Sequence, residues 1–195
     1  MSQADIDAFV GSIGFCNMLA PRGVTAAVAK GTPVNGLHSS WSATALHQAV
    51  RLMRPDVVVA LLAVGADVNV KIRYGYTSMW MAAANIKADI LQLLIEGGGN
   101  VNETNSDGET PLIALVKYNN NNNKNDAAAQ LQVLLACPEL DLDATYDGNT
   151  FGGGVLQSKP LLAAAIAKER RRRMQWSAFR VAWVAATVTP AAAPL

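Results

Sequence analysis

The sequence predicts an all-α fold, a solenoid of similar helix pairs joined by short β-hairpin fingers. The first observation behind this prediction is a repeat, because Thr44, Thr77 and Thr110 stand 33 residues apart and open the segments TALHQA, TSMWMA and TPLIAL. The second is that the copies also end in similar segments, LLAVGADVN at 61–69, LLIEGGGNVN at 93–102 and LLACPELDLD at 134–143. Self-similarity at such a period indicates a stack of supersecondary units rather than one globular core.

Each copy is expected to begin with a short helix. Over 45–50 the apolar residues recur at helical spacing and form one stripe. Thr44 is placed to act as the N-cap, since its hydroxyl can accept a hydrogen bond from a backbone N–H of the first turn. In the third copy Pro111 takes the first helical position, where a missing N–H is tolerated.

A second helix follows in each copy. In the first copy it is predicted over 56–64, after a turn at Pro55, and Gly65 ends it because glycine adopts the left-handed conformation without strain. The second copy repeats this pattern, with apolar residues over 90–94 before three consecutive glycines. The predicted β-hairpin-like fingers are the stretches rich in Gly, Asn, Asp and Tyr at 66–76 and 99–109.

The opening of each copy resembles the T-P-L-H-x-A opening of the ankyrin repeat family. The resemblance implies a single domain over 1–195, closed at both ends by atypical repeats. A fourth opening, DGNT at 147–150, falls 40 residues after DGET at 107–110, and an Asn-rich insertion at 119–125 accounts for the surplus of seven. The implied divisions are a degenerate N-terminal capping repeat at 4–36, repeats at 37–70, 71–103 and 104–146, and a divergent C-terminal capping repeat at 147–188.

The insertion and the C-terminal repeat are the least regular parts of the pattern. The Asn-rich tract lies between the two helices of the third repeat, where each doubling of loop length costs only about 0.6 kcal/mol. It is interpreted as a tolerated insertion, with a functional Asn-rich arm as the alternative. In the last repeat, a first helix is predicted over 159–167 and a partner helix over 168–188.

The composition indicates a folded chain without a strong electrostatic preference. Hydrophobic residues make up 51% of the 195 positions and charged residues 16%, which is ample for a packed core. The net charge of +1 gives no reason to expect a nucleic-acid or membrane partner. Cys16 and Cys137 show no pairing pattern and are predicted to be buried free thiols. Since the first ten residues also lack the basic start of a secretory signal, we expect a cytoplasmic protein, with a nuclear location as the alternative and secretion excluded.

Groups that could perform catalysis are scarce. His47 stands at the histidine position of the family, and the resemblance implies that its ring hydrogen-bonds the backbone of the adjoining finger. Two histidines and two cysteines at unrelated spacings match no zinc pattern, and no P-loop, HExxH or GxSxG motif is present. We therefore predict a monomeric protein that is not an enzyme and needs no cofactor or metal.

The resemblance instead implies a scaffold or adaptor for another protein. Ankyrin-like stacks bind partners mainly through the finger tips and the exposed face of the first helices, and Tyr, Trp and Arg are the usual residues of interface hot spots. Trp80 replaces the family histidine, and two interpretations of it remain: it contacts a partner, or it fills space between repeats. The predicted partner-binding residues are Trp41, Arg51, Lys71, Arg73, Tyr74, Tyr76, Trp80, Asp107, Glu109 and Tyr118.

A second distinctive surface is the basic amphipathic segment 168–188. Its aromatic residues recur at helical spacing, and its arginines crowd the N-terminal half, where the helix dipole disfavours cations. One interpretation is a closing helix with solvated arginines. The alternative is a peripheral-membrane or calmodulin-binding adaptor that acts through this helix. The residues of this alternative site are Arg170, Arg171, Arg172, Arg173, Trp176, Arg180 and Trp183.

Overall fold

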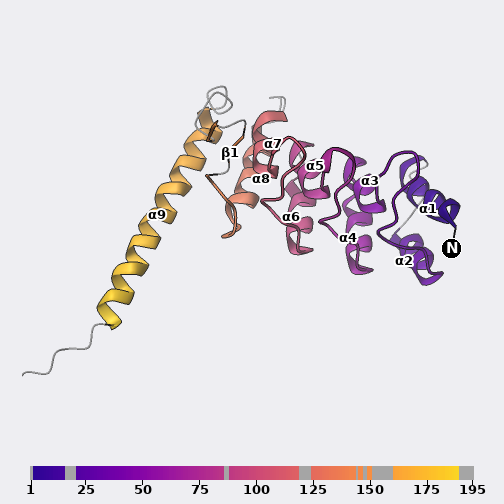
Figure 1. Cartoon of the computed structure of the whole chain (residues 1–195), viewed down its shortest axis with the longest axis horizontal. Helices are drawn as coiled ribbons and strands as arrows, with labels where there is room; N and C mark the ends of the chain where they lie inside the picture. Colours follow the sequence, from indigo (N-terminus) through magenta and orange to yellow (C-terminus); the bar gives the residue numbers. More distant parts are fainter. Residues whose placement is uncertain are drawn as a thin grey trace, which may run out of the picture.

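The computed structural model describes residues 2–15, 21–85, 88–118, 124–143, 145–146, 149–150 and 160–188. Within these ranges, helices form a row of pairs along one axis (Figure 1), and the predicted all-α repeat solenoid is confirmed. The helices are α1 (Gln3–Phe15), α2 (Pro21–Ala29), α3 (Ala45–Arg51), α4 (Pro55–Ala63), α5 (Ser78–Ala84), α6 (Ala88–Glu96), α7 (Pro111–Tyr118), α8 (Lys124–Leu135) and α9 (Pro160–Val188), with the 3-10 turn η1 (Arg73–Gly75).

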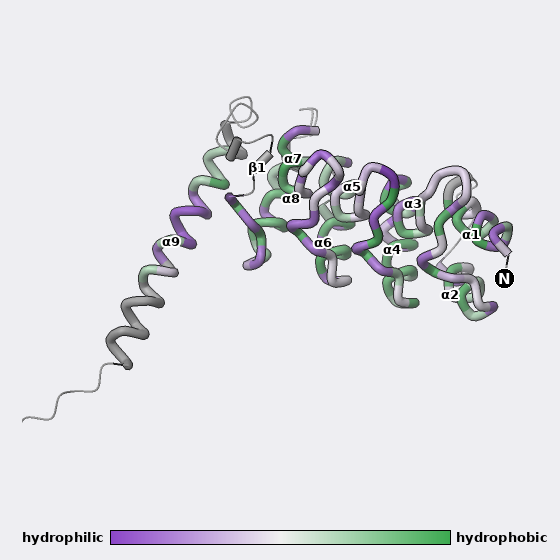
Figure 2. The backbone as a smooth tube through the Cα atoms, in the orientation of Figure 1, coloured by the Kyte–Doolittle hydropathy of each residue, from purple (hydrophilic) through white to green (hydrophobic). Residues whose placement is uncertain are grey.

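The helices α1 to α8 make two layers, and each helix packs against its counterpart in the next repeat. One layer contains α1, α3, α5 and α7, and the other contains α2, α4, α6 and α8. Apolar side chains between the layers, such as Leu46, Leu61, Leu91 and Leu134, are fully buried. Burying each of them contributes about 1.5–3 kcal/mol. Figure 2 shows the result as largely apolar helices bordered by polar finger tips and turns.

The recurrent threonines cap the first helices, as predicted. Oγ1 of Thr44, Thr77 and Thr110 accepts a hydrogen bond from the backbone N–H three residues further on, at N···O distances of 3.4, 3.1 and 3.3 Å. The second helix of the first full copy, α4, lies within one residue of its predicted bounds. Gly65 follows it with a φ of +85°, the left-handed conformation expected of it.

The fingers are hairpin-shaped loops rather than paired strands, which corrects one detail of the prediction. Each finger is closed by a backbone hydrogen bond between residues only four or five positions apart, so it has no length for a ladder of such bonds. The closing bonds run from His38 N to Ala43 O, from Ile72 N to Tyr76 O and from Asn105 N to Glu109 O, at 3.0, 2.9 and 3.1 Å. Among the described residues, the strands are β1 (Thr145–Tyr146) and β2 (Asn149–Thr150), an antiparallel pair outside these fingers.

Asparagine side chains tie each repeat to the next. Oδ1 of Asn69 accepts a hydrogen bond from the backbone N–H of Asn100 at 2.8 Å, and its Nδ2 donates to the carbonyl of Gly98 at 3.1 Å. These bonds satisfy backbone groups in turns that lack a regular secondary structure partner. The same backbone N–H bond recurs from Asp67 to Asn35 and from Asp141 to Asn102, at 2.9 and 2.8 Å.

Replacing Asn69 with alanine is expected to lower the free energy of unfolding by about 1–2 kcal/mol, because two hydrogen bonds between neighbouring repeats are lost. Urea denaturation measures the change. Gln92→Ala is the control, since it removes an exposed bond to Glu96 within α6 and should cost less than about 0.5 kcal/mol. Equal losses in the two variants would contradict a role of Asn69 in joining the repeats.

The C-terminal repeat does not contain the two helices predicted for it. Residues 160–188 form one helix, α9, which reaches away from the stack (Figure 1). After Pro160 the helix contains no proline and no glycine, and it is rich in Ala and Arg, which favour helix. Nothing in the local sequence therefore breaks the helix at the predicted junction of 167 and 168.

Two further predictions fall partly outside the described residues. Cys16 and positions 119–123 of the Asn-rich insertion lie outside them, whereas Lys124 and Asn125 belong to α8. Cys137 is described and is a buried free thiol, as predicted. Its burial raises the pKa of the thiol, which keeps the group protonated and unreactive near neutral pH.

Candidate functional site

The predicted partner-binding residues come from three fingers and from the helices α3, α5 and α7. We term this surface the finger face and define it by the fingers 38–43, 71–76 and 105–109 together with those helices. Trp41 and Tyr76 are half-buried on it, and Trp80 and Glu109 are buried beneath it. The exposed members are Arg51, Lys71, Arg73, Tyr74, Asp107 and Tyr118.

The prediction that Glu109 is presented at the surface is wrong. Its side chain is 0% exposed, and its Oε1 lies 2.5 Å from Nζ of Lys117 on α7. Its other oxygen, Oε2, accepts a hydrogen bond from Nδ2 of Asn105 at 3.0 Å, and the hydroxyl of Tyr118 lies 3.3 Å from Oε1. The carboxylate therefore holds the third finger and α7 together from the inside.

Four aromatic rings form a continuous row across this face. The ring centroids of Tyr74 and Tyr76 are 6.1 Å apart, those of Tyr76 and Trp80 are stacked at 4.3 Å, and Trp80 meets Tyr118 edge-on at 5.4 Å. The middle of the row is the most enclosed, since Trp80 is 8% exposed whereas Tyr74 is 57% and Tyr118 42% exposed. This burial supports the interpretation in which Trp80 fills space between repeats.

The protein environment changes the acidity of two rings in the row. Burial raises the pKa of Tyr76. Burial also raises the pKa of Tyr118, and the neighbouring charge of Glu109 adds to that shift. Both hydroxyls therefore stay protonated at neutral pH and can donate hydrogen bonds.

The tip of the second finger combines an exposed aromatic ring with a cation in an unusual backbone. Tyr74 has a φ of +64°, in the left-handed region that bulky residues rarely adopt. The guanidinium carbon of Arg73 lies 4.8 Å from the centroid of the Tyr74 ring, within the range of a cation–π contact. Both side chains are exposed, so neither is held by the core.

His47 is a buried structural residue. Its Nδ1 lies 2.7 Å from Oγ1 of Thr44, and it is 1% exposed. Burial lowers the pKa of the imidazole to about 4, although the nearby main chain of Tyr76 and Val70 acts to raise that pKa. The ring is therefore neutral near pH 7. Its Nε2 is buried without a hydrogen-bond partner among the described residues, so the bond to the backbone of the adjoining finger that the resemblance implied is not formed.

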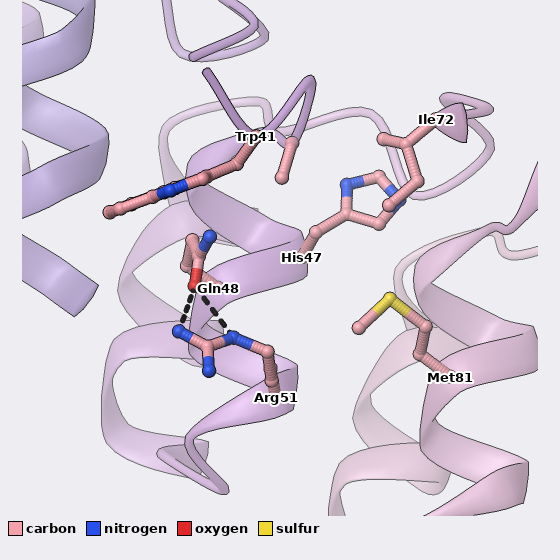
Figure 3. Close-up of a pocket in the computed structure, with 7 residues that line it drawn as sticks. Trp41, His47, Gln48, Arg51, Ile72 and Met81 are labelled. Carbon is pink, nitrogen blue, oxygen red and sulfur yellow. Dashed lines mark hydrogen bonds between the residues drawn. The ribbon is translucent and has the colours of Figure 1, made fainter. Parts of the chain in front are cut away.

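An open hollow of about 400 Å³ lies between α3 and α5 (Figure 3). On the α3 side, Nε and Nη2 of Arg51 donate hydrogen bonds to Oε1 of Gln48 at 2.9 and 2.7 Å. Figure 3 shows the Trp41 ring above Gln48, and Met81 of α5 across the opening from Arg51. The hollow is lined by Trp41, Ala43, His47, Gln48, Arg51, Ile72 and Met81.

Only Trp41 and Arg51 of this hollow were among the predicted partner-binding residues; Ala43, His47, Gln48, Ile72 and Met81 were not. Gln48 and Met81 stand 33 residues apart, each directly after the position held by His47 or Trp80. Because this position points to the same face in both copies, comparing it between copies could have identified them. Ile72 carries no comparable signal, since it is one apolar residue in a polar finger.

The cations of the finger face fall into two groups. Lys71 pairs with Glu103 at 2.5 Å, and Lys117 pairs with Glu109. In contrast, no carboxylate in the described part of the chain lies within 4.0 Å of the guanidinium of Arg51 or Arg73. Of these two arginines, Arg51 lines the hollow.

Two arginines of the alternative site bind carbonyls at the end of α8 and in the segment that follows it. The guanidinium of Arg173 donates to the carbonyls of Leu135, Cys137 and Leu140 at 3.2, 2.9 and 2.7 Å. Carbonyls at a helix C-terminus lack partners within the helix and carry partial negative charge, so they attract cations. Arg170 likewise donates to the carbonyl of Leu142 at 3.0 Å.

The rest of the alternative site is less engaged with the stack. Arg172 pairs with Glu169 on the same helix, and Arg171 is exposed. The side chains of Trp176, Arg180 and Trp183 lie outside the described part of α9. The closing-helix interpretation therefore gains specific contacts from Arg170 and Arg173, and its expectation of solvated arginines is wrong for these two.

The described residues contain neither a candidate membrane span nor a cluster of metal-binding side chains. No helix among the described residues combines the length and the apolar character needed to cross a lipid bilayer. In the same part of the chain, no three or more His, Cys, Asp or Glu side chains gather in a way that could hold a metal ion.

Comparison with known families gives a match over the middle of the chain. A family model described as ankyrin repeats (3 copies) matches residues 46–131. The matched segment runs from α3 into α8 and includes the second and third fingers.

Individual proteins are similar over shorter stretches. A putative ankyrin repeat protein of fowlpox virus is 39% identical over 59 residues, which are 30% of this chain and 22% of that protein. An ankyrin repeat-containing protein of Schizosaccharomyces pombe is 38% identical over 64 residues, 33% of this chain and 31% of that protein. BCL-6 corepressor-like protein 1 of Homo sapiens is 35% identical over 108 residues, 55% of this chain and 6% of that protein. The similar region thus spans less than a third of the length of each of these relatives.

Proposed function

This chain is an ankyrin-repeat protein over residues 46–131, and from that premise we propose that it is a non-catalytic scaffold that binds a partner protein through the finger face. Ankyrin repeats are in general protein-interaction modules and typically have no catalytic activity. In this proposal the protein is a monomer and resides in a reducing compartment, the cytoplasm or the nucleus. The buried free thiol of Cys137 supports a reducing location.

The observation that carries the proposal is the exposed tip of the second finger. A tyrosine in the left-handed region costs roughly 1–2 kcal/mol compared with glycine, so Tyr74 is placed there at the expense of local stability. Strained residues of this kind cluster at functional sites. Tyr and Arg side by side, exposed and adjacent to a row of aromatic rings, have the composition of an interface hot spot.

The double variant Arg73→Ala/Tyr74→Asn is expected to weaken partner binding by at least about tenfold, because hot-spot side chains carry most of the binding energy. Asparagine is chosen at position 74 since it tolerates a positive φ, so folding should be unaffected. Affinity capture from native cell extract, quantified against the unaltered protein, measures the loss.

The matched control is Arg22→Ala/Val59→Asn, which changes an exposed arginine and a half-exposed apolar residue on the other helix layer. The proteins captured by the unaltered chain should also be captured by this control. If the finger variant, shown to be folded by its denaturation midpoint, captures the same proteins in the same amounts, the proposed function is overturned.

A further inference from the structure

The hollow between α3 and α5 joins an apolar wall to a cation. Trp41 and Ile72 form the wall on the finger side, and Met81 forms it on the α5 side. All three side chains are half-buried, so they present apolar surface without being closed off by the core. Arg51 at the edge of the same hollow is exposed.

Arg51 is held in place by a neutral group. Its two hydrogen bonds to Oε1 of Gln48 fix the guanidinium without cancelling its charge. A guanidinium has further N–H groups beyond the two used here, arranged in a fork that matches both oxygens of a carboxylate. An arginine fixed in this way loses little conformational entropy when a carboxylate binds.

The charges around the hollow favour an anionic group. Arg73 follows Ile72 directly, and neither Arg73 nor Arg51 has a carboxylate within 4.0 Å among the described residues. Lys71 and Lys117, which are further cations of the finger face, are each matched by a glutamate of this chain. Among the described residues, Arg51 is therefore the cation without a carboxylate partner that lines the hollow beside the apolar wall, whereas the guanidinium of Arg73 lies over the Tyr74 ring at the tip of the second finger.

We infer that the hollow receives a segment of the partner protein in which a carboxylate side chain stands next to a large apolar side chain. The apolar side chain lies against Trp41, Ile72 and Met81, and the carboxylate pairs with Arg51. A basic segment would meet the charge of Arg51, which has no carboxylate within 4.0 Å among the described residues, and a small anion would leave the apolar wall unused. The inference rests on the proposed function and adds the chemistry of the partner to it.

Selection from a phage-displayed library of random twelve-residue peptides on the full chain tests the inference. The enriched peptides should share an Asp or Glu beside a Leu, Ile, Met, Phe or Trp. Synthetic copies of them should bind Arg51→Glu at least about tenfold more weakly, because the substitution places like charges together. They should also lose binding when their own acid is replaced by its amide, or their apolar residue by serine.

The matched control is Arg22→Glu, which makes the same change in net charge at an exposed arginine of α2 and should bind the peptides with less than about a twofold change. Enriched peptides without an acid, equal binding to Arg51→Glu and the unaltered chain, equal losses in Arg51→Glu and Arg22→Glu, or no enrichment at all would each overturn the inference. In these cases the capture experiment with Arg73→Ala/Tyr74→Asn still decides separately whether the proposed function stands.

Discussion

Replacing Lys117 with methionine is expected to lower the free energy of unfolding by about 3 kcal/mol, because it leaves a buried carboxylate without its cation. Glu109 is 0% exposed, and Nζ of Lys117 is the cation at its Oε1. After the substitution the carboxylate keeps hydrogen bonds from Asn105 and Tyr118, which are neutral and offset part of the loss. The side chain of Lys117 is 34% exposed, so the expected loss is at the low end for a broken buried ion pair.

The double variant Lys117→Met/Glu109→Gln separates the orphaned charge from the loss of packing. The amide of glutamine has the shape of the carboxylate but no charge, so the double variant should regain most of the stability lost in the single one. Urea denaturation of all three proteins at pH 7 measures the difference. If the double variant is as unstable as Lys117→Met, the loss comes from the missing contact of the Lys117 ammonium with the Tyr118 ring, 5.3 Å from its centroid, rather than from the buried charge.

Much of the fold could be predicted because the repeat makes local signals visible several times over. A threonine followed by a short apolar stripe predicts a capped helix weakly in one copy, but three copies at the same spacing predict it firmly. The left-handed glycine after α4 follows from the same reasoning. These features depend on residues within one turn of each other, which a sequence shows directly.

Features that depend on side-chain contacts beyond one helical turn could not be predicted in this way. Glu109 precedes the cap Thr110 and has the character of a polar finger residue. It is nevertheless buried, because Asn105, Lys117 and Tyr118 contact its carboxylate. Arg173 reads as one of four solvated arginines, yet it reaches carbonyls 33 to 38 residues earlier in the chain. The partners of Glu109 lie four to nine residues away in the same repeat, and those of Arg173 lie in the preceding repeat. Neither contact is visible in the local helix and cap pattern.

In the candidate site, too, some residues could be predicted from the sequence and others could not. Its exposed members, such as Arg73 and Tyr74, could be predicted from finger position and residue type. The hollow could not, since it is formed by Gln48 on one helix and Met81 on the next, with a finger residue between them. Only the stacking distance of the two repeats brings these side chains to the same opening (Figure 3).

Replacing Gly75 with alanine is expected to lower the free energy of unfolding by about 3 kcal/mol, from backbone strain and overpacking together. Gly75 has a φ of +71°, and a Cβ there would lie 2.8 Å from the backbone nitrogen of Ser106 and 3.2 Å from the carbonyl carbon of Asn105. These are backbone atoms of the third finger, which cannot move aside as a flexible side chain can. The neighbouring bond from Ser106 N to Tyr74 O, 2.9 Å long, would be strained with them.

Gly65→Ala is the matched control for Gly75→Ala, because Gly65 has a φ of +85° and a Cβ added there would meet no described heavy atom within 4 Å. It should lose only the left-handed penalty, about 1 kcal/mol. Since Gly75 sets the distance between the second and third fingers, Gly75→Ala should also weaken partner binding, whereas Gly65→Ala should not. Equal losses of stability in the two variants, by urea denaturation, would show that the two fingers are not in close contact in solution. In that case the row from Tyr74 to Tyr118 would not act as one rigid surface.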